Sequence, residues 1–341
     1  MKNAIPLLAL LLATTRVTAQ NKIDYSAPPN APYTAEEVTI PAKGYTLAGT
    51  LLLPKNRTGK LPAVLTITGS GLQTRDEPLP MPGLEKYALM RQIAENLASR
   101  GIAVLRVDDR GVGNSGGRET LANATTSGFA DDVRAEVNYL RTRSEIDPKR
   151  IALVGHSEGG TIAPMVAVTD PAIAAIVLMA GGGKRGDQIS LQQQSDALDS
   201  IPGMTPEIKK QKVAEEQEII NAVQTGGDLS KYPAGVRSPW LKEFWTYDPI
   251  PTIRKVRQPI LILQGALDRQ VTHEQADLLE EAARAGGNTN VTKQVFPNLN
   301  HLFLPAKTGG VDEYSKLETS SVPDDLLKTL GDWLVKALKV K

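Results

Sequence analysis

The sequence predicts an α/β fold, in which a doubly wound, mostly parallel sheet is covered by helices on both faces and carries an inserted helical cap. Short, almost fully apolar runs alternate with helical segments through most of the chain, and such runs are typical of parallel strands buried on both faces. Residues 184–257 interrupt this alternation with polar helical sequence. At 341 residues, the chain suits one core domain with an insertion better than two independent domains.

Each element is predicted from its local pattern. Residues 37–41 and 45–53 are rich in β-forming residues and are separated by Lys43-Gly44, which predicts an antiparallel hairpin. The remaining strands are apolar runs at 63–68, 103–107, 151–154, 174–179, 260–263 and 292–296. Helical segments are expected at 87–100, 129–144, 161–168 and 272–285, with an amphipathic closing helix at 324–339. Two helices, 190–200 and 206–224, are expected inside the interrupting stretch.

The N-terminal residues predict an export signal. Lys2 precedes an apolar run at 5–13, and small residues at 17–19 offer a cleavage site. The run is shorter than the roughly 20 residues that a membrane-spanning helix needs. We therefore expect cleavage after Ala19, a periplasmic or secreted mature protein that begins at Gln20, and no membrane span in that mature protein.

The predicted organisation has four segments. Residues 1–19 form the signal peptide, 20–183 the first part of the core, 184–257 the helical cap, and 258–341 the second part of the core. Within the first core part, residues 20–35 are polar and proline-rich and predict an N-terminal arm.

Composition excludes several classes of function. Lys plus Arg number 39 against 38 acidic residues, so a net charge of +1 gives no electrostatic case for nucleic acid or an anionic membrane. The chain has no cysteine, which excludes disulfides, thiolate catalysis and cysteine-ligated metals. Its histidines number 3, and no two of them have helical ligand spacing. We expect no metal, no cofactor and a small-molecule substrate; oligomeric state is not predicted.

Ser157 is the predicted nucleophile. The pattern Gly155-His156-Ser157-Glu158-Gly159 follows a buried strand and precedes an apolar helix, as expected of a sharp turn that exposes a serine. Ser115 lies in a second G-x-S-x-G match, but polar sequence follows it, so we interpret it as a loop serine. The side chain of His156 is expected to point away from the nucleophile.

A serine needs a base, and the base needs an acid that holds its tautomer. After an elbow of this kind, the acid comes next along the chain and the histidine last. Asp268 follows the strand at 260–263, and His301 lies in a loop directly after the strand at 292–296. His273 also follows Asp268, but Thr272 and Gln275 predict a capping box that places it in an exposed first helical turn.

The oxyanion hole requires two backbone N–H groups near the serine. One is expected from Glu158, the residue after the nucleophile. The other is expected from the small-residue loop after the strand at 63–68, where Ser70 is favoured and Gly71 is the alternative.

Aromatic residues crowd the end of the predicted cap at Trp240, Phe244, Trp245 and Tyr247. Such density suits an apolar wall of a substrate pocket. Packing of the cap against the core explains it equally well. We assign Trp240, Phe244 and Trp245 to substrate binding as a prediction.

These motifs together resemble the α/β-hydrolase family, and in particular exported bacterial esterase-like serine hydrolases. The matching segments span nearly the whole mature sequence: GHSEGG at 155–160, DDRGVGNSGG at 108–117, LQGALD at 263–268, NLNH at 298–301, and a GSG loop followed by an R-D-E cluster at 75–77. The resemblance implies a capped doubly wound sheet, no cofactor, and hydrolysis of acyl esters. The chain departs from many relatives in having Thr68-Gly69 where they carry His-Gly.

Three functions are compatible with these residues. The first is carboxylic ester hydrolysis, and the second is cleavage of short or proline-containing peptides. Such a peptidase usually needs an acidic anchor for the substrate amine, but the glutamates of the cap (Glu207, Glu215, Glu216 and Glu218) lie on a helical run that is typical of a solvated face. The third is a catalytically silent binding protein, which has no need of Ser157, Asp268 and His301 together.

Arg75 and Arg110 either line the mouth of the site or form surface salt bridges.

Overall fold

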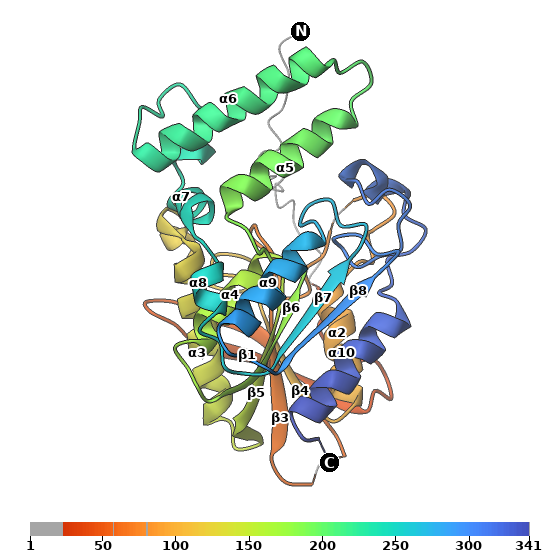
Figure 1. Ribbon diagram of the computed structural model, residues 1–341. Helices are drawn as coiled ribbons and strands as arrows, with labels where there is room; N and C mark the ends of the chain where they lie inside the picture. The colour runs from red at the N-terminus through yellow and green to blue at the C-terminus, as the bar shows by residue number, and fades with distance from the viewer. Residues whose placement is uncertain (1–22, 57, 80, 341) are drawn as a thin grey trace.

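The structure is a computed structural model that describes residues 23–340 apart from positions 57 and 80. Within this part of the chain, an 8-stranded sheet has the order β1-β2-β4-β3-β5-β6-β7-β8 (Figure 1). Its strands are β1 (Tyr33–Pro41), β2 (Thr46–Pro54), β3 (Leu61–Ile67), β4 (Ala103–Val107), β5 (Ile146–His156), β6 (Ile173–Met179), β7 (Ile260–Gly265) and β8 (Val291–Phe296).

Most strand pairs are parallel, as predicted. β1 pairs antiparallel with β2, which confirms the expected N-terminal hairpin, and β2 pairs antiparallel with β4. Every pairing from β4 through β3 to β8 is parallel. Because the carboxyl ends of parallel strands meet at one edge of the sheet, the loops after β3, β5, β7 and β8 gather there.

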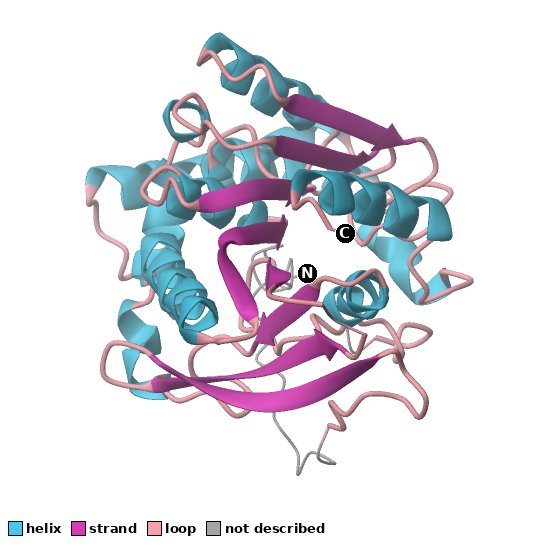
Figure 2. Cartoon of the chain, turned by 90° about the horizontal axis from the view of Figure 1, so that it is seen from below, coloured by secondary structure: helices cyan, strands magenta, loops and turns pink. Residues whose placement is uncertain are grey.

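Helices cover both faces of the sheet (Figure 2). The apolar core on one face includes buried residues of three helices, α3 (Thr126–Thr142), α4 (Glu158–Ala167) and α9 (Glu274–Ala285). The core on the other face includes buried residues of α2 (Leu89–Ser99) and α10 (Asp324–Ala337). This double cover explains why β3 is buried at all 7 of its positions and has an almost entirely apolar sequence.

A helical segment joins β6 to β7, and its first helices lie beyond the carboxyl edge of the sheet (Figure 1). Its helices are α5 (Gly186–Asp199), α6 (Pro206–Thr225), η2 (Ala234–Arg237), α7 (Pro239–Thr246) and α8 (Ile250–Ile253). Clear signals bound α6: the side chain of Thr205 accepts the N–H of Ile208, and Gly226 ends the helix with φ 72°. The segment has its own small apolar core, formed by Ile220, Val223, Val236, Leu241 and Trp245.

Two local predictions are wrong. Strand β1 begins at Tyr33, so the last residues of the expected N-terminal arm belong to the sheet. No side chain caps α9, so the Thr272–Gln275 capping box is absent. Instead, the side chain of Gln275 accepts the backbone N–H of Gly183 at 3.0 Å, which ties α9 to the start of the helical segment.

The predicted signal peptide lies outside the described residues. Among the helices of the described chain, none combines the length and the apolar character that crossing a membrane requires.

Candidate active site

Ser157 occupies a strained turn between β5 and α4. Its backbone has φ 53° and ψ −115°, which is sterically costly for a residue with a side chain and marks a strand-to-helix elbow. The neighbouring glycines permit this turn. A Cβ on Gly155 would lie 2.0 Å from the carbonyl oxygen of Gly159, and a Cβ on Gly159 would lie 2.3 Å from that of Ile67.

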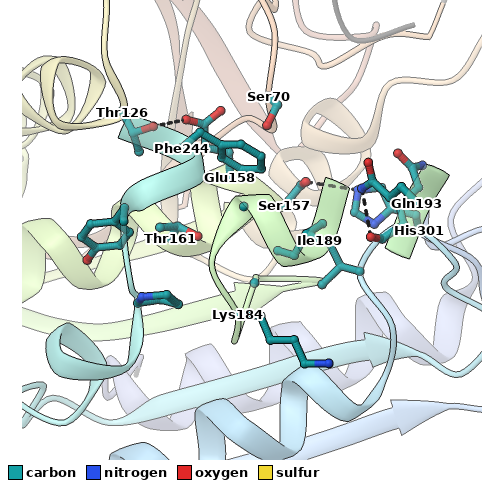
Figure 3. A pocket seen from close by; sticks show the side chains of 16 residues that line it. Ser70, Thr126, Ser157, Glu158, Thr161, Lys184, Ile189, Gln193, Phe244 and His301 are labelled. Carbon is teal, nitrogen blue, oxygen red and sulfur yellow. Dashed lines mark hydrogen bonds between the residues drawn. The ribbon is translucent and has the colours of Figure 1, made fainter. Parts of the chain in front are cut away.

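Ser157, His301 and Asp268 form a hydrogen-bonded relay. The Oγ of Ser157 lies 3.2 Å from Nε2 of His301 (Figure 3). Nδ1 of His301 lies 2.8 Å from Oδ2 of Asp268. A carboxylate only accepts hydrogen bonds, so it holds the imidazole proton on Nδ1. Nε2 is then free to accept the serine proton, which is the arrangement that a general base needs.

Asp268 is held rigidly in the loop after β7. Its Oδ1 accepts the backbone N–H groups of Gln270 at 2.9 Å and Val271 at 2.8 Å. Its Oδ2, which faces His301, also accepts from the side chain of Gln264 at 3.0 Å. With 3% of the residue exposed, the carboxylate is fixed by protein groups rather than by water.

The loop that carries His301 is also braced. The side-chain oxygen of Asn300 accepts the backbone N–H groups of Leu302 at 3.0 Å and Leu304 at 3.1 Å, which closes a tight turn around His301. Asn300 itself is completely buried.

The competing serine and histidine lie in other settings. The hydroxyl of Ser115 donates to the carbonyl of Asp108 at 2.7 Å and accepts the N–H of Ala48 at 2.8 Å, so it joins the loop after β4 to β2. His273 is exposed at the start of α9, with Glu274 at 3.9 Å as its charged neighbour.

The loop after β3 lies against Ser157. The N–H of Gly69 donates to Oε1 of Glu77 at 2.7 Å and is therefore not available to a substrate. The N–H groups of Ser70 and Glu158 have no hydrogen-bond partner among the described residues. Ser70 lines the cavity that contains Ser157, whereas Gly71 lines a second cavity, so the geometry favours Ser70 over Gly71.

The cavity around Ser157 lies between the sheet edge and the helical segment. It is mixed in polarity, because Ile189 and Phe244 line it together with polar residues that sequence patterns had not indicated, including Thr126, Gln193 and Gln270. These residues come from four separate elements or loops, and no spacing in the sequence relates them.

The aromatic cluster of the helical segment divides between two roles. Phe244 and Tyr247 line the cavity. Trp240 stacks on Phe244 with 5.3 Å between ring centroids, behind the cavity wall. Trp245 is completely buried and donates to the hydroxyl of Ser190 at 2.9 Å. The expected contact of Trp245 with substrate is therefore wrong, since this face of α7 packs into the segment's own core.

The carboxyl of Glu158 joins the helical segment to the elbow. Its Oε1 accepts the hydroxyl of Thr126 at 2.6 Å and the indole N–H of Trp240 at 2.8 Å. Burial raises the pKa of Glu158, although hydrogen bonds from Thr126, Trp240 and Ser70 lower it in part. On the same helix as Trp240, Glu243 accepts the N–H of Ser127 at 2.9 Å, so α7 is tied to the starts of α3 and α4.

Both interpretations of the two arginines are wrong. Arg75 has no exposed side-chain surface and pairs with buried Asp108. Nη2 of Arg75 lies 2.8 Å from Oδ2 of Asp108. Arg110 pairs with Asp132 at 2.6 Å and is also largely buried. Neither lines the cavity around Ser157. Removing one partner of such a buried pair typically costs about 3–5 kcal/mol of stability.

No group of three His, Asp or Glu side chains is arranged to hold a metal ion among residues 23–340, leaving aside 57 and 80. The relay described above is built entirely from protein groups.

A family model described as "Hydrolase_4: Serine aminopeptidase, S33" matches residues 83–306, which is more than half of the chain. The chain belongs to this family of α/β hydrolases. The matched residues include the elbow at Ser157, the helical segment, Asp268 and His301. Membership confirms the resemblance to α/β hydrolases that the motifs had predicted.

Individual relatives are more distant. An uncharacterised protein of Mycobacterium tuberculosis is 37% identical over 91 residues, which cover 27% of this chain and 30% of that protein. The match thus spans less than a third of that relative.

Solved structures of low identity share the fold. An esterase of Pyrococcus furiosus has a TM-score of 0.61 and 17% identity, and the match covers 94% of this chain and 97% of that chain. Est1E from Butyrivibrio proteoclasticus, with ferulic acid bound, has a TM-score of 0.58 and 17% identity over 89% of this chain and 99% of that chain. These similarities confirm the α/β-hydrolase fold.

Proposed function

We propose that this protein hydrolyses carboxylic esters through an acyl-enzyme on Ser157, with His301 as the base and Asp268 as the residue that orients it. The observation that carries the proposal is the relay from Asp268 through His301 to Ser157, at 2.8 Å and 3.2 Å. The open N–H groups of Ser70 and Glu158 beside the serine support it further.

In the first half of the reaction, Oγ of Ser157 attacks the ester carbonyl carbon while Nε2 of His301 accepts the hydroxyl proton. The carbonyl oxygen becomes an oxyanion that the N–H groups of Ser70 and Glu158 stabilise. When the carbon–oxygen bond to the alcohol breaks, His301 donates its proton to the leaving alcohol. Water then repeats the sequence on the acyl-enzyme and releases the carboxylic acid.

The test combines labelling with turnover. A fluorophosphonate should form an adduct on Ser157, mapped by peptide mass spectrometry, and Ser157→Ala should abolish both the adduct and hydrolysis of a p-nitrophenyl ester. An adduct on Ser115 with Ser157 unmodified would overturn the assignment. A panel of esters of graded chain length defines the preferred acyl group.

Peptide cleavage is the second candidate, because the family description names a serine aminopeptidase. A substrate amine would need an acidic anchor, but Glu207, Glu215, Glu216 and Glu218 all lie away from the cavity lining. Within the described chain, Glu158 is the one carboxylate that lines this cavity, and Thr126 and Trp240 already occupy its Oε1. Esters are therefore favoured. Faster turnover of aminoacyl or prolyl amides than of matched esters would reverse this choice.

A further inference from the structure

A second buried histidine lies directly behind the relay. His156 precedes the nucleophile, and 3% of it is exposed. Its Nδ1 lies 2.8 Å from Oε1 of Glu77, and its Nε2 lies 2.9 Å from the backbone carbonyl oxygen of His301. The rings of His156 and His301 are neighbours, with centroids 4.9 Å apart. The ring therefore does not line the cavity around Ser157 and packs instead beside the loop that carries His301.

The partners of His156 determine its protons. A carbonyl oxygen only accepts hydrogen bonds, so Nε2 must carry a proton. Nδ1 faces a carboxylate oxygen that already accepts the N–H of Gly69 at 2.7 Å. A second proton on Nδ1 makes His156 an imidazolium that is paired with the Glu77 carboxylate. Burial on its own would lower the pKa of His156. The charge and hydrogen bond of Glu77, together with the hydrogen bond to the His301 carbonyl and the charge of Asp268, outweigh burial, and the pKa is raised.

One oxygen of Glu77 serves both contacts. Oε1 accepts from Gly69 and from His156, whereas Oε2 is buried without a partner among the described residues. Glu77 itself is fixed in an unusual conformation, with φ 52° and its N–H donating to the carbonyl of Thr74 at 2.9 Å.

This oxygen links the two loops that serve the nucleophile. Gly69 immediately precedes Ser70, the proposed oxyanion donor, and packs so closely that a Cβ there would lie 2.9 Å from Oε1 of Glu77 and 3.1 Å from Cβ of Ser157. On the other side, His156 holds the backbone of the loop that carries His301. A shift of Glu77 would therefore move the oxyanion donor and the base together.

We propose that Glu77 and His156 are positioning residues, a buried ion pair that holds the oxyanion loop and the His301 loop in register around Ser157. The inference rests on the proposed hydrolase function. Neither side chain lines the cavity around Ser157, so the pair acts on the rate of the chemical step and not on substrate affinity.

The central variant is Glu77→Gln. The amide of Gln carries no charge, so it cannot keep His156 as an imidazolium. Once Nδ1 of His156 has lost its proton, one oxygen can no longer accept from both Gly69 and His156. Misplacing one oxyanion donor costs up to about 100–1,000-fold in kcat. We expect kcat on an activated ester to fall at least about tenfold, with KM changed by less than about twofold.

The control must separate positioning from general destabilisation. Leu140→Ala removes a fully buried side chain near the end of α3, and it lowers Tm without contact with the site. At a temperature where both variants remain folded, Leu140→Ala should retain the wild-type kcat. A Glu77→Gln enzyme with wild-type kcat, or with a loss that Leu140→Ala reproduces at equal Tm, would overturn the proposal.

A double-mutant cycle tests whether the two residues act as one unit. Asn at position 156 can donate to Glu77 but cannot reach the His301 carbonyl, so His156→Asn should also lower kcat. Because the pair works together, the kcat of the double variant Glu77→Gln with His156→Asn should be no lower than the kcat of the less active single variant. Losses that multiply in the double variant would show independent roles and contradict the pair.

The charge state has its own signature. The chain has only 3 histidines, so imidazole ¹⁵N NMR resolves each of them. In the wild type at neutral pH, both ring nitrogens of His156 should be protonated, and Glu77→Gln should abolish that pattern. A neutral His156 in the wild type would overturn the ion pair. If the wild type hydrolyses no ester, the proposed function fails; an active wild type with a neutral His156 refutes the inference alone.

Discussion

The proposed roles of His301 and His273 rest on what each imidazole contacts. His301 lies between a buried carboxylate and the serine hydroxyl, whereas His273 lies exposed at the start of α9. Without the base, no group accepts the hydroxyl proton of Ser157, so His301→Ala should lower kcat by several orders of magnitude. His273→Ala should retain activity and change stability by less than about 0.5 kcal/mol.

The measurement is turnover of one activated ester by both variants, with folding checked by circular dichroism. An inactive His273→Ala enzyme beside an active His301→Ala enzyme would show that the third member of the relay is assigned incorrectly.

Local sequence patterns were enough to predict the turn and the strand end on which these residues lie. The elbow at Ser157 is a short strand–turn–helix pattern, and the position of Asp268 follows from a single strand end. The contact of Glu77 with His156 joins residues separated by 79 positions in the chain. No spacing predicts such a contact, and the R-D-E cluster at 75–77 suggested only a role for its arginine.

At the scale of elements, the apolar strands and amphipathic helices were predictable because burial on both faces requires an unbroken apolar sequence. The orientation of α7 was not, because it depends on how the inserted segment packs. The helix places Phe244 on the cavity and the adjacent Trp245 in the segment's core, although both are large aromatic residues.

This division predicts different outcomes for the two neighbours. Phe244→Ala should change the relative kcat/KM across esters of graded chain length, because it removes an apolar wall of the cavity. Trp245→Ala should instead lower stability by about 3–5 kcal/mol, since it empties a completely buried site. The activity of the Trp245→Ala enzyme should fall by a similar factor on every ester.

Ester profiles and thermal melts of both variants check this prediction. A chain-length preference that changes in Trp245→Ala but stays constant in Phe244→Ala would mean that α7 presents its other face to the substrate.

At the scale of the whole molecule, a group of buried carboxyls beside the sheet influences how stability depends on pH. The face covered by α3 encloses a second cavity lined by Asp109, Asp132 and Glu136. Burial raises the pKa of Asp109 to about 8 and raises the pKa of Asp132. For Glu136, burial raises the pKa well above its usual value, and the charges of Asp132 and Asp109 raise it further.

A carboxyl whose pKa is higher in the folded state than in the unfolded state binds its proton more tightly when folded. Its contribution to stability is complete below the ordinary value of 4.5 and is lost as pH rises through the folded pKa. The free energy of unfolding of the wild type should therefore fall as the pH rises above about 5 and through the pKa of Asp109 at about 8. The free energy of unfolding of Glu136→Gln, whose side chain has nearly the same shape but cannot ionise, should fall less steeply over that range.

Urea unfolding at each pH measures the slope. The control is Glu281→Gln, which removes an exposed carboxylate on α9 and should keep the wild-type slope. Parallel slopes for Glu136→Gln and the wild type would mean that Glu136 releases its proton equally easily in the folded and unfolded states.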